Sequence, residues 1–302
     1  MIDYIYLGLY RIFGSILKIL PESCRIGLMR YLASFVYLVG KKHRKIINTN
    51  LDFAFDNTLD EAEKKEIGKA AYMNLIDTVF VLMRREEMSK EQVIGNVSFE
   101  GEDIVNELIS RGKKIIFVTG HYGNWELVSQ SLAIKFDLQL VIVGRKLDSE
   151  TMDNILKRNR ERFNIEMVYK RGATKGCINA LNHSKAVGML IDQSLPEKQG
   201  IKVNFFGKAV SHTTLASILA RRYETVLVPV FMHTDDYRAY QLTIYPGIPF
   251  QKSDNTQADI LKMTQAQADI MEKVIRKDPK QWFWMHKRWK VYYPELYKKG
   301  TK

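Results

Sequence analysis

The sequence is poor in cysteine and in the residues that form linkers. Its 302 residues include two cysteines, Cys24 and Cys177, with neither a CxxC pair nor Cys/His metal-ligand spacing. The sequence therefore indicates neither a disulfide scaffold nor a zinc site, and a reducing, cytosol-facing location fits. The seven prolines are scattered, and no Gly/Ser-rich or Pro-rich run interrupts the chain. The sequence predicts one continuous body, residues 46–302, preceded by a helical segment, residues 1–45.

Several motifs that carry enzyme chemistry are missing as well. The chain has no GxSxG nucleophile elbow and no HExxH zinc motif, and it lacks both the GxGxxG and the GxxxxGK[ST] phosphate loops. Zincin chemistry, a dinucleotide cofactor and a nucleoside triphosphate therefore have no support. Hydrophobic residues occupy 46% of positions, which is enough for a sizeable core.

Positive charge is concentrated at the two ends of the chain. The formal net charge is +12. Residues 1–50 carry eight basic and two acidic side chains, and residues 271–302 carry ten basic and three acidic ones, so the middle is close to neutral. Both basic ends accompany apolar stretches, which suits an anionic membrane surface. A nucleic-acid binder usually spreads its cations along a groove or recognition helix, so no nucleic-acid partner is expected.

The first segment has the pattern of a helix that lies on a membrane. Ile5, Leu9, Ile12, Ile16 and Ile19 recur at helical spacing, whereas the charged residues fall on one narrow arc. The cationic interruptions argue against a spanning helix, and the acidic amino end argues against a cleaved signal peptide. A second apolar segment, residues 25–40, runs into a basic cluster at residues 41–45 that could hold phosphate groups. The alternatives are an ordinary helix packed on the core and a single pass through the membrane.

Beyond residue 57 the pattern alternates between helices and strands. Thr58, with Glu61 three residues on, predicts the start of a helix that ends near Arg85. Short runs rich in Val and Ile predict buried strands at residues 114–119, 138–144, 186–191, 225–232 and 240–245. Helical patterns separate them at residues 125–135, 149–163, 174–182, 213–223 and 255–276. This alternation predicts an α/β sandwich around a mostly parallel or mixed central sheet, with ligands beyond the carboxyl ends of its strands.

The turn after the first of these strands carries the chemistry. The strand ends at Gly120, and the chain turns through His121 and Gly123 before a helix begins near Asn124. Glu126 follows five positions after His121, where the turn could bring its carboxylate back to the imidazole. A histidine oriented by a carboxylate is a general base able to take a proton from a hydroxyl. A structural His–Glu pair is the other interpretation. Because no protein nucleophile accompanies the pair, we expect direct attack by a substrate hydroxyl.

The segment HYGNWE, residues 121–126, resembles the HxxxxE form of the HxxxxD/E signature of glycerolipid-type acyltransferases. More narrowly, nearly the whole chain resembles the late acyltransferases of bacterial lipid A biosynthesis, the lauroyl/myristoyl transferase family. The elements that carry this resemblance are Asn50-Leu51 with Ala54-Phe55, Gly120 to Glu126, Arg160 to Phe163, Asp192-Gln193, Phe205 to Gly207, and Gln281 to Lys290. The family usually shows Tyr-Arg-Pro where this chain has Gly144-Arg145-Lys146.

The resemblance implies a role for several of these residues. His121 would deprotonate the acceptor hydroxyl, with Glu126 holding and polarising the imidazole. The donor would be a fatty thioester on acyl carrier protein, so no metal or bound cofactor is required. Arg160 would stabilise charge near the thioester or a substrate phosphate, and Asp192 would order the pocket wall by hydrogen bonding. The other substrate-binding candidates are Asn124, Arg145, Gln193, Lys287 and Arg288.

The last of these elements mixes aromatic rings with cations. Trp282, Phe283, Trp284 and Trp289 alternate with basic side chains, a composition that suits a membrane interface. A packed C-terminal strand with solvated charges is the alternative.

The expected activity is therefore acyl transfer to a hydroxyl of a phosphorylated glycolipid, a Kdo-bearing lipid A precursor, to form an acyloxyacyl group. Residues 46–302 would form the catalytic domain, and residues 1–45 would associate with the cytoplasmic face of the bacterial inner membrane. Two alternatives stay open. One is a different glycolipid or lysolipid acceptor, such as a phosphatidylinositol mannoside, and the other is a non-catalytic lipid-binding protein on the same scaffold.

Overall fold

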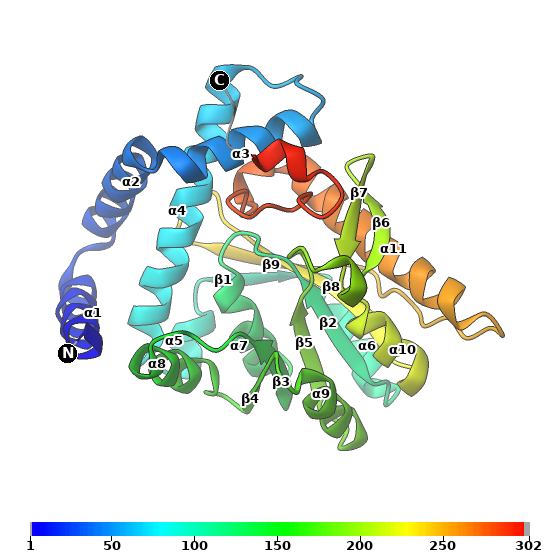
Figure 1. Cartoon of the computed structure of the whole chain (residues 1–302). Helices are drawn as coiled ribbons and strands as arrows, with labels where there is room; N and C mark the ends of the chain where they lie inside the picture. Colours follow the sequence, from blue (N-terminus) through cyan, green and yellow to red (C-terminus); the bar gives the residue numbers. More distant parts are fainter. Residues whose placement is uncertain (1, 299–302) are drawn as a thin grey trace.

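A seven-stranded sheet forms the centre of the molecule (Figure 1). The structure, a computed structural model, describes residues 2–298. Neighbouring strands are parallel in the order β1-β9-β8-β2-β5-β3-β4, except that β8 and β9 run antiparallel. The strands are β1 (Val97–Glu100), β2 (Ile115–Thr119), β3 (Leu140–Gly144), β4 (Ile165–Tyr169), β5 (Ala186–Leu190), β8 (Val226–His233) and β9 (Tyr240–Ile244). The predicted α/β fold with a mixed central sheet is confirmed.

Helices cover both faces of this sheet. One layer contains α6 (Glu102–Ser110) and α7 (Trp125–Lys135), and the other contains α9 (Ala173–Asn182), α10 (Leu215–Tyr223) and α11 (Thr256–Lys277). The short helix α8 (Glu150–Arg160) packs beside β4. Strand β2 therefore buries Ile116 and Val118 in one core and Ile115 and Phe117 in the other. A strand covered on both faces is apolar throughout, which explains why its sequence predicted it.

The sequence analysis did not predict four of the strands. β1 and β4 lie at the two edges of the sheet, where exposed residues such as Glu100 and Glu166 interrupt the apolar pattern. β6 (Ile201–Phe205) and β7 (Lys208–His212) form a separate antiparallel hairpin packed on α11. Edge and hairpin strands carry a weaker apolar signal than buried ones, and the prediction depended on that signal.

The long helix α4 (Glu61–Arg85) begins two residues later than predicted. The Asp60 side chain accepts a hydrogen bond from the Glu63 backbone N–H at 2.8 Å, and the Glu63 carboxylate accepts one from the Asp60 N–H at 2.8 Å. Thr58 instead donates its hydroxyl to the Phe55 carbonyl at 2.6 Å. The prediction of Thr58 as the N-cap was wrong, because Asp60 and Glu63 form the reciprocal capping box themselves.

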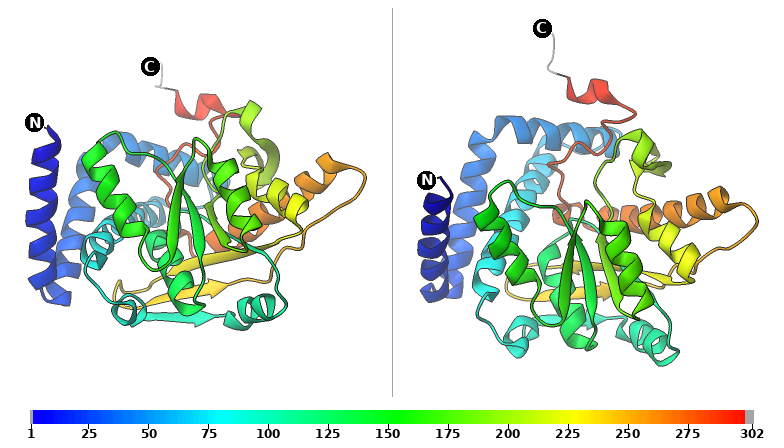
Figure 2. Two further views of the ribbon diagram at one scale, coloured as in Figure 1. Left: turned by 90° about the horizontal axis from the view of Figure 1, so that it is seen from below. Right: turned by 60° about the horizontal axis from the view of Figure 1, so that its bottom comes forward.

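Three helices precede α4: α1 (Ile2–Ile19), α2 (Glu22–Val39) and α3 (Lys41–Ala54). Both views of Figure 2 show α1 at the outer edge of the molecule. The side of α1 that contacts the body buries Leu17 and packs Phe13 against Phe80. Two polar contacts flank this side, since Lys18 pairs with Glu87 at 2.7 Å and Asp3 accepts a hydrogen bond from Ser149 at 2.7 Å. Within residues 2–298, no helix is both long and apolar enough to cross a bilayer.

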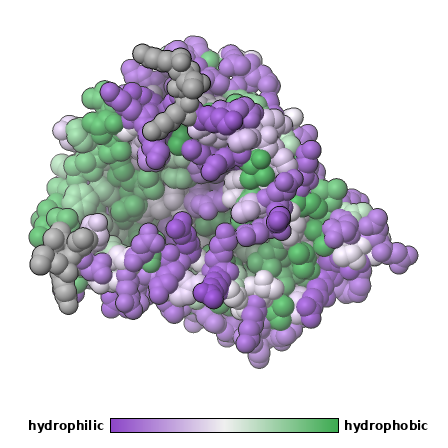
Figure 3. Space-filling view, viewed as in Figure 1, coloured by the Kyte–Doolittle hydropathy of each residue, from purple (hydrophilic) through white to green (hydrophobic). Residues whose placement is uncertain are grey.

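The opposite sides of α1 and α2 expose large apolar side chains (Figure 3). This surface, which we call the apolar N-terminal face, consists of Tyr6, Leu9, Ile12, Ile16, Ile19, Tyr31, Phe35, Val36, Leu38 and Val39. The side chain of Ile5, the first residue of the predicted stripe, lies outside the described set. Isolated exposed apolar residues are ordinary, but a contiguous face marks a contact surface. In the adjoining basic cluster, Arg44 donates to the carbonyls of Tyr37 and Leu38, so this cation closes the end of α2.

Candidate active site

The turn after β2 is fixed by contacts with the C-terminal segment. Gly123 has φ +52°, and a Cβ atom there would lie 2.0 Å from the Met232 carbonyl oxygen, so the position requires glycine. The Gly123 N–H donates to the Gln281 carbonyl at 2.8 Å, and the Phe283 N–H donates to the His121 carbonyl at 2.9 Å. His121 is thereby held at the carboxyl end of β2, as the sequence predicted.

Asp192, not Glu126, orients the His121 imidazole. Asp192 follows β5, the parallel neighbour of β2, and its Oδ1 accepts a hydrogen bond from His121 Nδ1 at 2.7 Å. Its Oδ2 accepts from the His121 backbone N–H at 2.8 Å and from Trp282 Nε1 at 3.0 Å. Because an ionised carboxylate only accepts hydrogen bonds, Nδ1 carries the proton and the Nε2 lone pair is available as a base.

The electrostatics of this pair match its geometry. Burial disfavours the imidazolium form of His121, but the Asp192 carboxylate outweighs burial and raises the pKa of the imidazole above its usual value. Asp192 is fully buried, which by itself favours the neutral acid; contact with His121 nevertheless holds the pKa of this carboxyl well below its usual range. Asp192 is therefore ionised at neutral pH, and His121 is a stronger base than a free histidine.

Glu126 has a different partner, which corrects the predicted His–Glu pairing. Its two oxygens accept from Arg160 Nε at 2.9 Å and from Arg160 Nη2 at 2.5 Å, a bidentate pair. Burial would raise the pKa of Glu126, but Arg160 outweighs it and lowers this pKa below the ordinary value. Arg160 comes from the end of α8, and its guanidinium offers a planar fork that a neutral imidazole lacks. The carboxylate therefore pairs with the arginine.

A cavity of about 460 Å³ adjoins both pairs. Its polar lining includes His121, Glu126, Arg145, Arg160 and Gln193. Its apolar lining comes from α7 and the strands and includes Phe117, Val128, Leu132, Leu140, Ile142 and Val230. The cavity extends along the whole of β3, because both its first residue, Leu140, and its last residue, Gly144, line the wall. At about 3.3 Å per residue the cavity follows the strand for roughly 13 Å, so it has the form of an apolar slot with an imidazole at its polar end.

Not all predicted substrate-binding residues reach this cavity. Arg145 and Gln193 line it, and the Gln193 side-chain nitrogen lies 3.4 Å from His121 Nε2. Asn124 is fully buried and donates to Asp77 at 2.8 Å, and Arg288 is fully buried and donates to the Ser211 carbonyl at 2.8 Å. Both side chains are enclosed by protein and are absent from the cavity wall. Lys287 is also absent from the cavity wall, and its Nζ lies 5.5 Å from the centre of the Tyr297 ring.

The aromatic C-terminal segment is part of the core, which corrects both its assignment to a membrane interface and its alternative as a strand. Trp282, Trp284 and Trp289 are each 0% exposed, and the Trp282 and Trp284 ring centres lie 4.6 Å apart. The buried Asn50 of α3 donates to the carbonyls of Trp284 and His286 at 2.7 and 2.8 Å. Aromatic residues next to cations occur in both settings, and sequence composition did not separate them.

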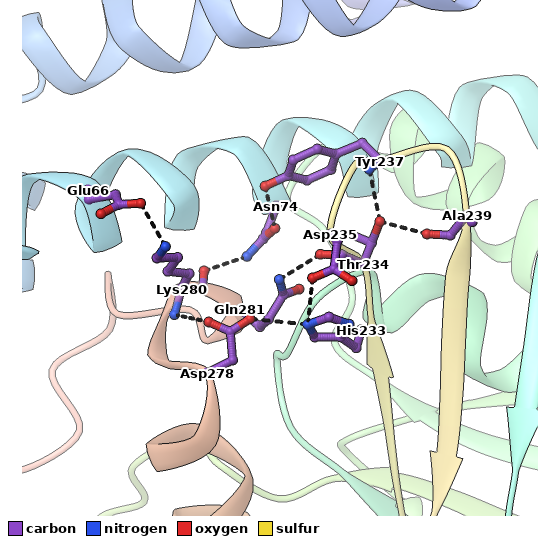
Figure 4. A network of polar contacts seen from close by, with 10 residues as sticks. All are labelled: Glu66, Asn74, His233, Thr234, Asp235, Tyr237, Ala239, Asp278, Lys280 and Gln281. Atoms are coloured by element: carbon purple, nitrogen blue, oxygen red, sulfur yellow. Dashed lines mark hydrogen bonds and ion pairs between the residues drawn. The ribbon is translucent and has the colours of Figure 1, made fainter.

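A polar network anchors the start of this segment to the rest of the body (Figure 4). Asn74 of α4 donates to the Lys280 carbonyl at 2.8 Å, and Gln281 donates to a backbone carbonyl just after β8 at 2.8 Å. His233, the last residue of β8, lies 3.2 Å from Asp278, and this contact raises the pKa of the imidazole. Helix α4 and strand β8 thus fix the loop whose Trp282 binds Asp192. Sequence reasoning missed this function of Trp282, since only the fold brings it to the carboxylate.

Comparison with known proteins agrees with the resemblance found in the sequence. The family model described as bacterial lipid A biosynthesis acyltransferase matches residues 1–291. The lipid A biosynthesis palmitoleoyltransferase of Escherichia coli (strain K12) is 24% identical over 276 residues, 90% of this chain and 86% of its own. The lauroyltransferase of that strain is 25% identical over 263 residues, covering 83% and 80%. A phosphatidylinositol mannoside acyltransferase of Mycobacterium tuberculosis (strain ATCC 25618 / H37Rv) is 22% identical over 203 residues, covering 66% and 60%.

The pairing of His121 with Asp192 makes a prediction about the pKa of the imidazole. In Asp192→Asn the pKa of His121 should fall, because burial persists while the carboxylate that stabilises the imidazolium is gone. NMR titration of the His121 ring protons measures this pKa. Gln193→Ala, which leaves the Nδ1 contact intact, should keep a pKa closer to that of the unmodified protein. An unchanged or higher pKa in Asp192→Asn would contradict the assignment.

Proposed function

Because the chain belongs to the bacterial lipid A biosynthesis acyltransferase family, we propose that it transfers a fatty acyl chain from acyl carrier protein to a hydroxyl of a Kdo-bearing lipid A precursor. One observation carries this proposal: the oriented His121 imidazole stands at the polar end of an apolar slot. An acyl chain in that slot would bring its thioester to Nε2, where an alcohol could meet it.

The reaction follows from the protonation state of His121. Nε2 takes the proton of the acceptor hydroxyl as its oxygen attacks the thioester carbonyl, and the imidazolium that forms is stabilised by Asp192. The tetrahedral intermediate then expels the carrier's thiolate, and the imidazolium returns the proton to sulfur. The products are an ester and a free carrier thiol. The imidazole returns the proton that it took, so the step needs no other acid or base.

Gln193 and the Glu126–Arg160 pair support the same step. The Gln193 side-chain nitrogen lies 3.4 Å from Nε2, close enough to donate to a substrate oxygen that sits against the imidazole. Glu126 holds Arg160 rigidly in the cavity wall, so Arg160 can present a fixed cation to the thioester carbonyl or to an acceptor phosphate. Glu126 acts here as a positioning residue for Arg160.

The apolar slot fits the acyl chain of the donor. Burial of hydrocarbon contributes about 0.8 kcal/mol per methylene, so a chain that fills the slot adds substantial binding energy. Gly188 of β5 lines the slot, and a Cβ atom there would lie 3.3 Å from Ile142 and 3.8 Å from Leu140. The absence of a side chain at position 188 therefore keeps the slot open.

The acceptor has a second candidate. The similarity to a phosphatidylinositol mannoside acyltransferase favours a different glycolipid for the same chemistry. Mass spectrometry of envelope lipids from a deletion strain separates the two candidates. Loss of one acyl chain from lipid A supports the first, and unchanged lipid A with a changed mannolipid or lysolipid supports the second.

Residues 1–45 form the membrane-associating part in this proposal, at the cytoplasmic face of the inner membrane, and residues 46–302 the catalytic domain. The side chains of the apolar N-terminal face would be buried at the boundary between head groups and acyl chains. The exposed Lys41, Lys42 and Lys45 lie next to the end of α2, where anionic head groups would meet them. The body covers the side of α1 that carries Leu17, so the exposed side with Leu9 and Ile16 is the one left for lipid.

Loss of the base should abolish most of the activity. In an assay with acyl carrier protein thioester and lipid A precursor, His121→Ala should lower kcat/KM by about 10²–10⁴-fold, the usual share of general acid–base catalysis. His183→Ala, an exposed histidine of the α9 C-cap, is the matched control and should retain full activity. In the unmodified enzyme kcat/KM should rise with pH through the pKa of His121, because only the neutral imidazole accepts a proton. Full activity of His121→Ala would exclude this mechanism.

Filling the slot should shorten the preferred acyl chain. Gly188→Leu should reduce kcat/KM for longer thioesters relative to shorter ones by roughly tenfold or more, since each methylene is worth about 1–3 kcal/mol in such a pocket. Gly188→Ala adds one methyl group, whose close 3.3 Å contact with Ile142 requires a shift of only a few tenths of an ångström, and should change the profile little. Rates over a series of acyl chain lengths measure the effect. An identical profile in Gly188→Leu and the unmodified enzyme would place the chain elsewhere.

Charges on the apolar N-terminal face should detach the protein from lipid. Leu9→Glu with Ile16→Glu should weaken flotation with vesicles that contain phosphatidylglycerol, because the apolar face can no longer enter the bilayer boundary. Ile218→Glu with Leu261→Glu is the matched control: these residues are each 41% exposed, as is Ile16, but lie on α10 and α11. Equal flotation of the two double variants would refute the role of this face.

A further inference from the structure

A second cavity, of about 240 Å³, lies among α2, α4, α5 (Lys90–Ile94) and the start of β9. It shares no lining residue with the catalytic cavity. In contrast to the apolar slot, its wall is rich in charged and amide side chains, and three of them are arginines: Arg25, Arg84 and Arg85.

These three arginines lack sufficient partners within residues 2–298. Arg85 is 2% exposed and donates to the Glu126 carbonyl and to Gln130, but its Nε has no hydrogen-bond partner. Arg84 is half-buried and forms no hydrogen bond or ion pair with the described residues. Arg25 is 8% exposed, and its one ion pair is to Glu22, from its own helix, at 3.2 Å. Guanidinium groups cannot shed their charge, and buried charges in proteins are normally paired.

The acidic residues of the cavity wall do not supply the missing partner. Glu22 is engaged by Arg25, and both oxygens of Asp77 accept hydrogen bonds, from Asn124 and from Tyr240, at 2.8 Å each. Burial raises the pKa of Asp77 to about 6, so this carboxyl is still largely ionised at neutral pH, and the two acidic side chains of the wall face three arginines. The pKa of Arg84 is lowered, first by burial and then by the neighbouring charge of Arg25. Two guanidinium groups thus repel each other across a cavity with a deficit of negative charge.

We propose that this second cavity binds a phosphate group, presented either as a free ion or as the head group of a lipid. The planar forks of Arg25 and Arg84 suit bidentate recognition of phosphate oxygens. Gln92 adds a side-chain amide to the wall, and its nitrogen makes no hydrogen bond to the described residues. The cavity volume admits a phosphate with part of an attached group and is too small for a folded partner.

The bound phosphate would lie close to groups that hold the catalytic turn. Arg85 donates to the Glu126 carbonyl, and Asp77 accepts from Asn124, the residue before α7. Helix α2, which supplies Arg25, also carries part of the apolar N-terminal face. A phosphate at this place would therefore connect the membrane-facing helices with the turn that bears His121.

The test is a titration of the purified full-length protein at constant ionic strength. Inorganic phosphate, with chloride as the reference salt, is one probe. Dihexanoyl phosphatidic acid below its micelle concentration, with dihexanoyl phosphatidylcholine as the reference lipid, is the other. We expect saturable binding by calorimetry that Arg84→Gln and Arg25→Gln each weaken roughly tenfold or more, the value of one charge-assisted hydrogen bond. Arg222→Gln, an exposed arginine of α10, should bind as the unmodified protein does.

The two probes distinguish the sources of the phosphate. Phosphatidic acid that binds at least tenfold more tightly than inorganic phosphate identifies a lipid head group, and equal affinities identify the free ion. If an arginine variant does not fold, protection of Arg84 from phenylglyoxal by phosphate, followed by mass spectrometry against Arg222 as the reference, gives the same information. The proposal is overturned if neither probe binds saturably to the unmodified protein, or if the arginine variants bind both probes as tightly as Arg222→Gln.

Discussion

The contact between the His121 imidazole and the Asp192 carboxylate is the interaction on which the rest of the site depends. A fully buried carboxylate is costly unless its oxygens are satisfied, and here three donors do so: the imidazole, the His121 backbone N–H and the Trp282 indole. Two of these donors come from the turn after β2 and one from the C-terminal segment. The C-terminal segment is itself fixed in place, because it packs three tryptophans into the core and its backbone accepts a hydrogen bond from Asn50 of α3. The architecture around the pair gives the imidazole one orientation and leaves Nε2 with a single long contact, to the Gln193 side-chain nitrogen at 3.4 Å.

Two carboxylates stand near the reacting position, and the structure divides their functions. Asp192 pairs with the base and raises its pKa, whereas Glu126 pairs with Arg160 and fixes a cation in the cavity wall. Because each carboxylate has its own cation or proton donor, the polar end of the slot is electrostatically ordered before a substrate arrives. Preorganisation of this kind is what lowers the cost of developing charge during acyl transfer.

The sequence predicted the buried strands because strands covered on both faces have an unbroken apolar pattern. It also predicted the place of His121, because this pattern stops at the end of β2, just before the turn. It did not predict the partner of His121. Spacing along the chain pointed to Glu126, five residues away, whereas the neighbour in space, Asp192, follows a strand whose position beside β2 is not encoded in local periodicity. The same limit applies to Trp282, whose composition fits an interface as well as a core. The start of α4 shows another limit of the sequence. Thr58 begins one capping pattern and Asp60 begins a second that overlaps it, and only the structure shows that the Asp60 pattern forms the cap.

The most direct test of this account is the kcat/KM of acyl transfer by Asp192→Asn, His121→Ala and the double variant, measured with the same thioester and acceptor. If Asp192 acts through the imidazole, its substitution costs activity only while His121 is present, and the double variant is no slower than His121→Ala. Losses that multiply in the double variant would show that the carboxylate acts independently of His121, and would contradict the central claim.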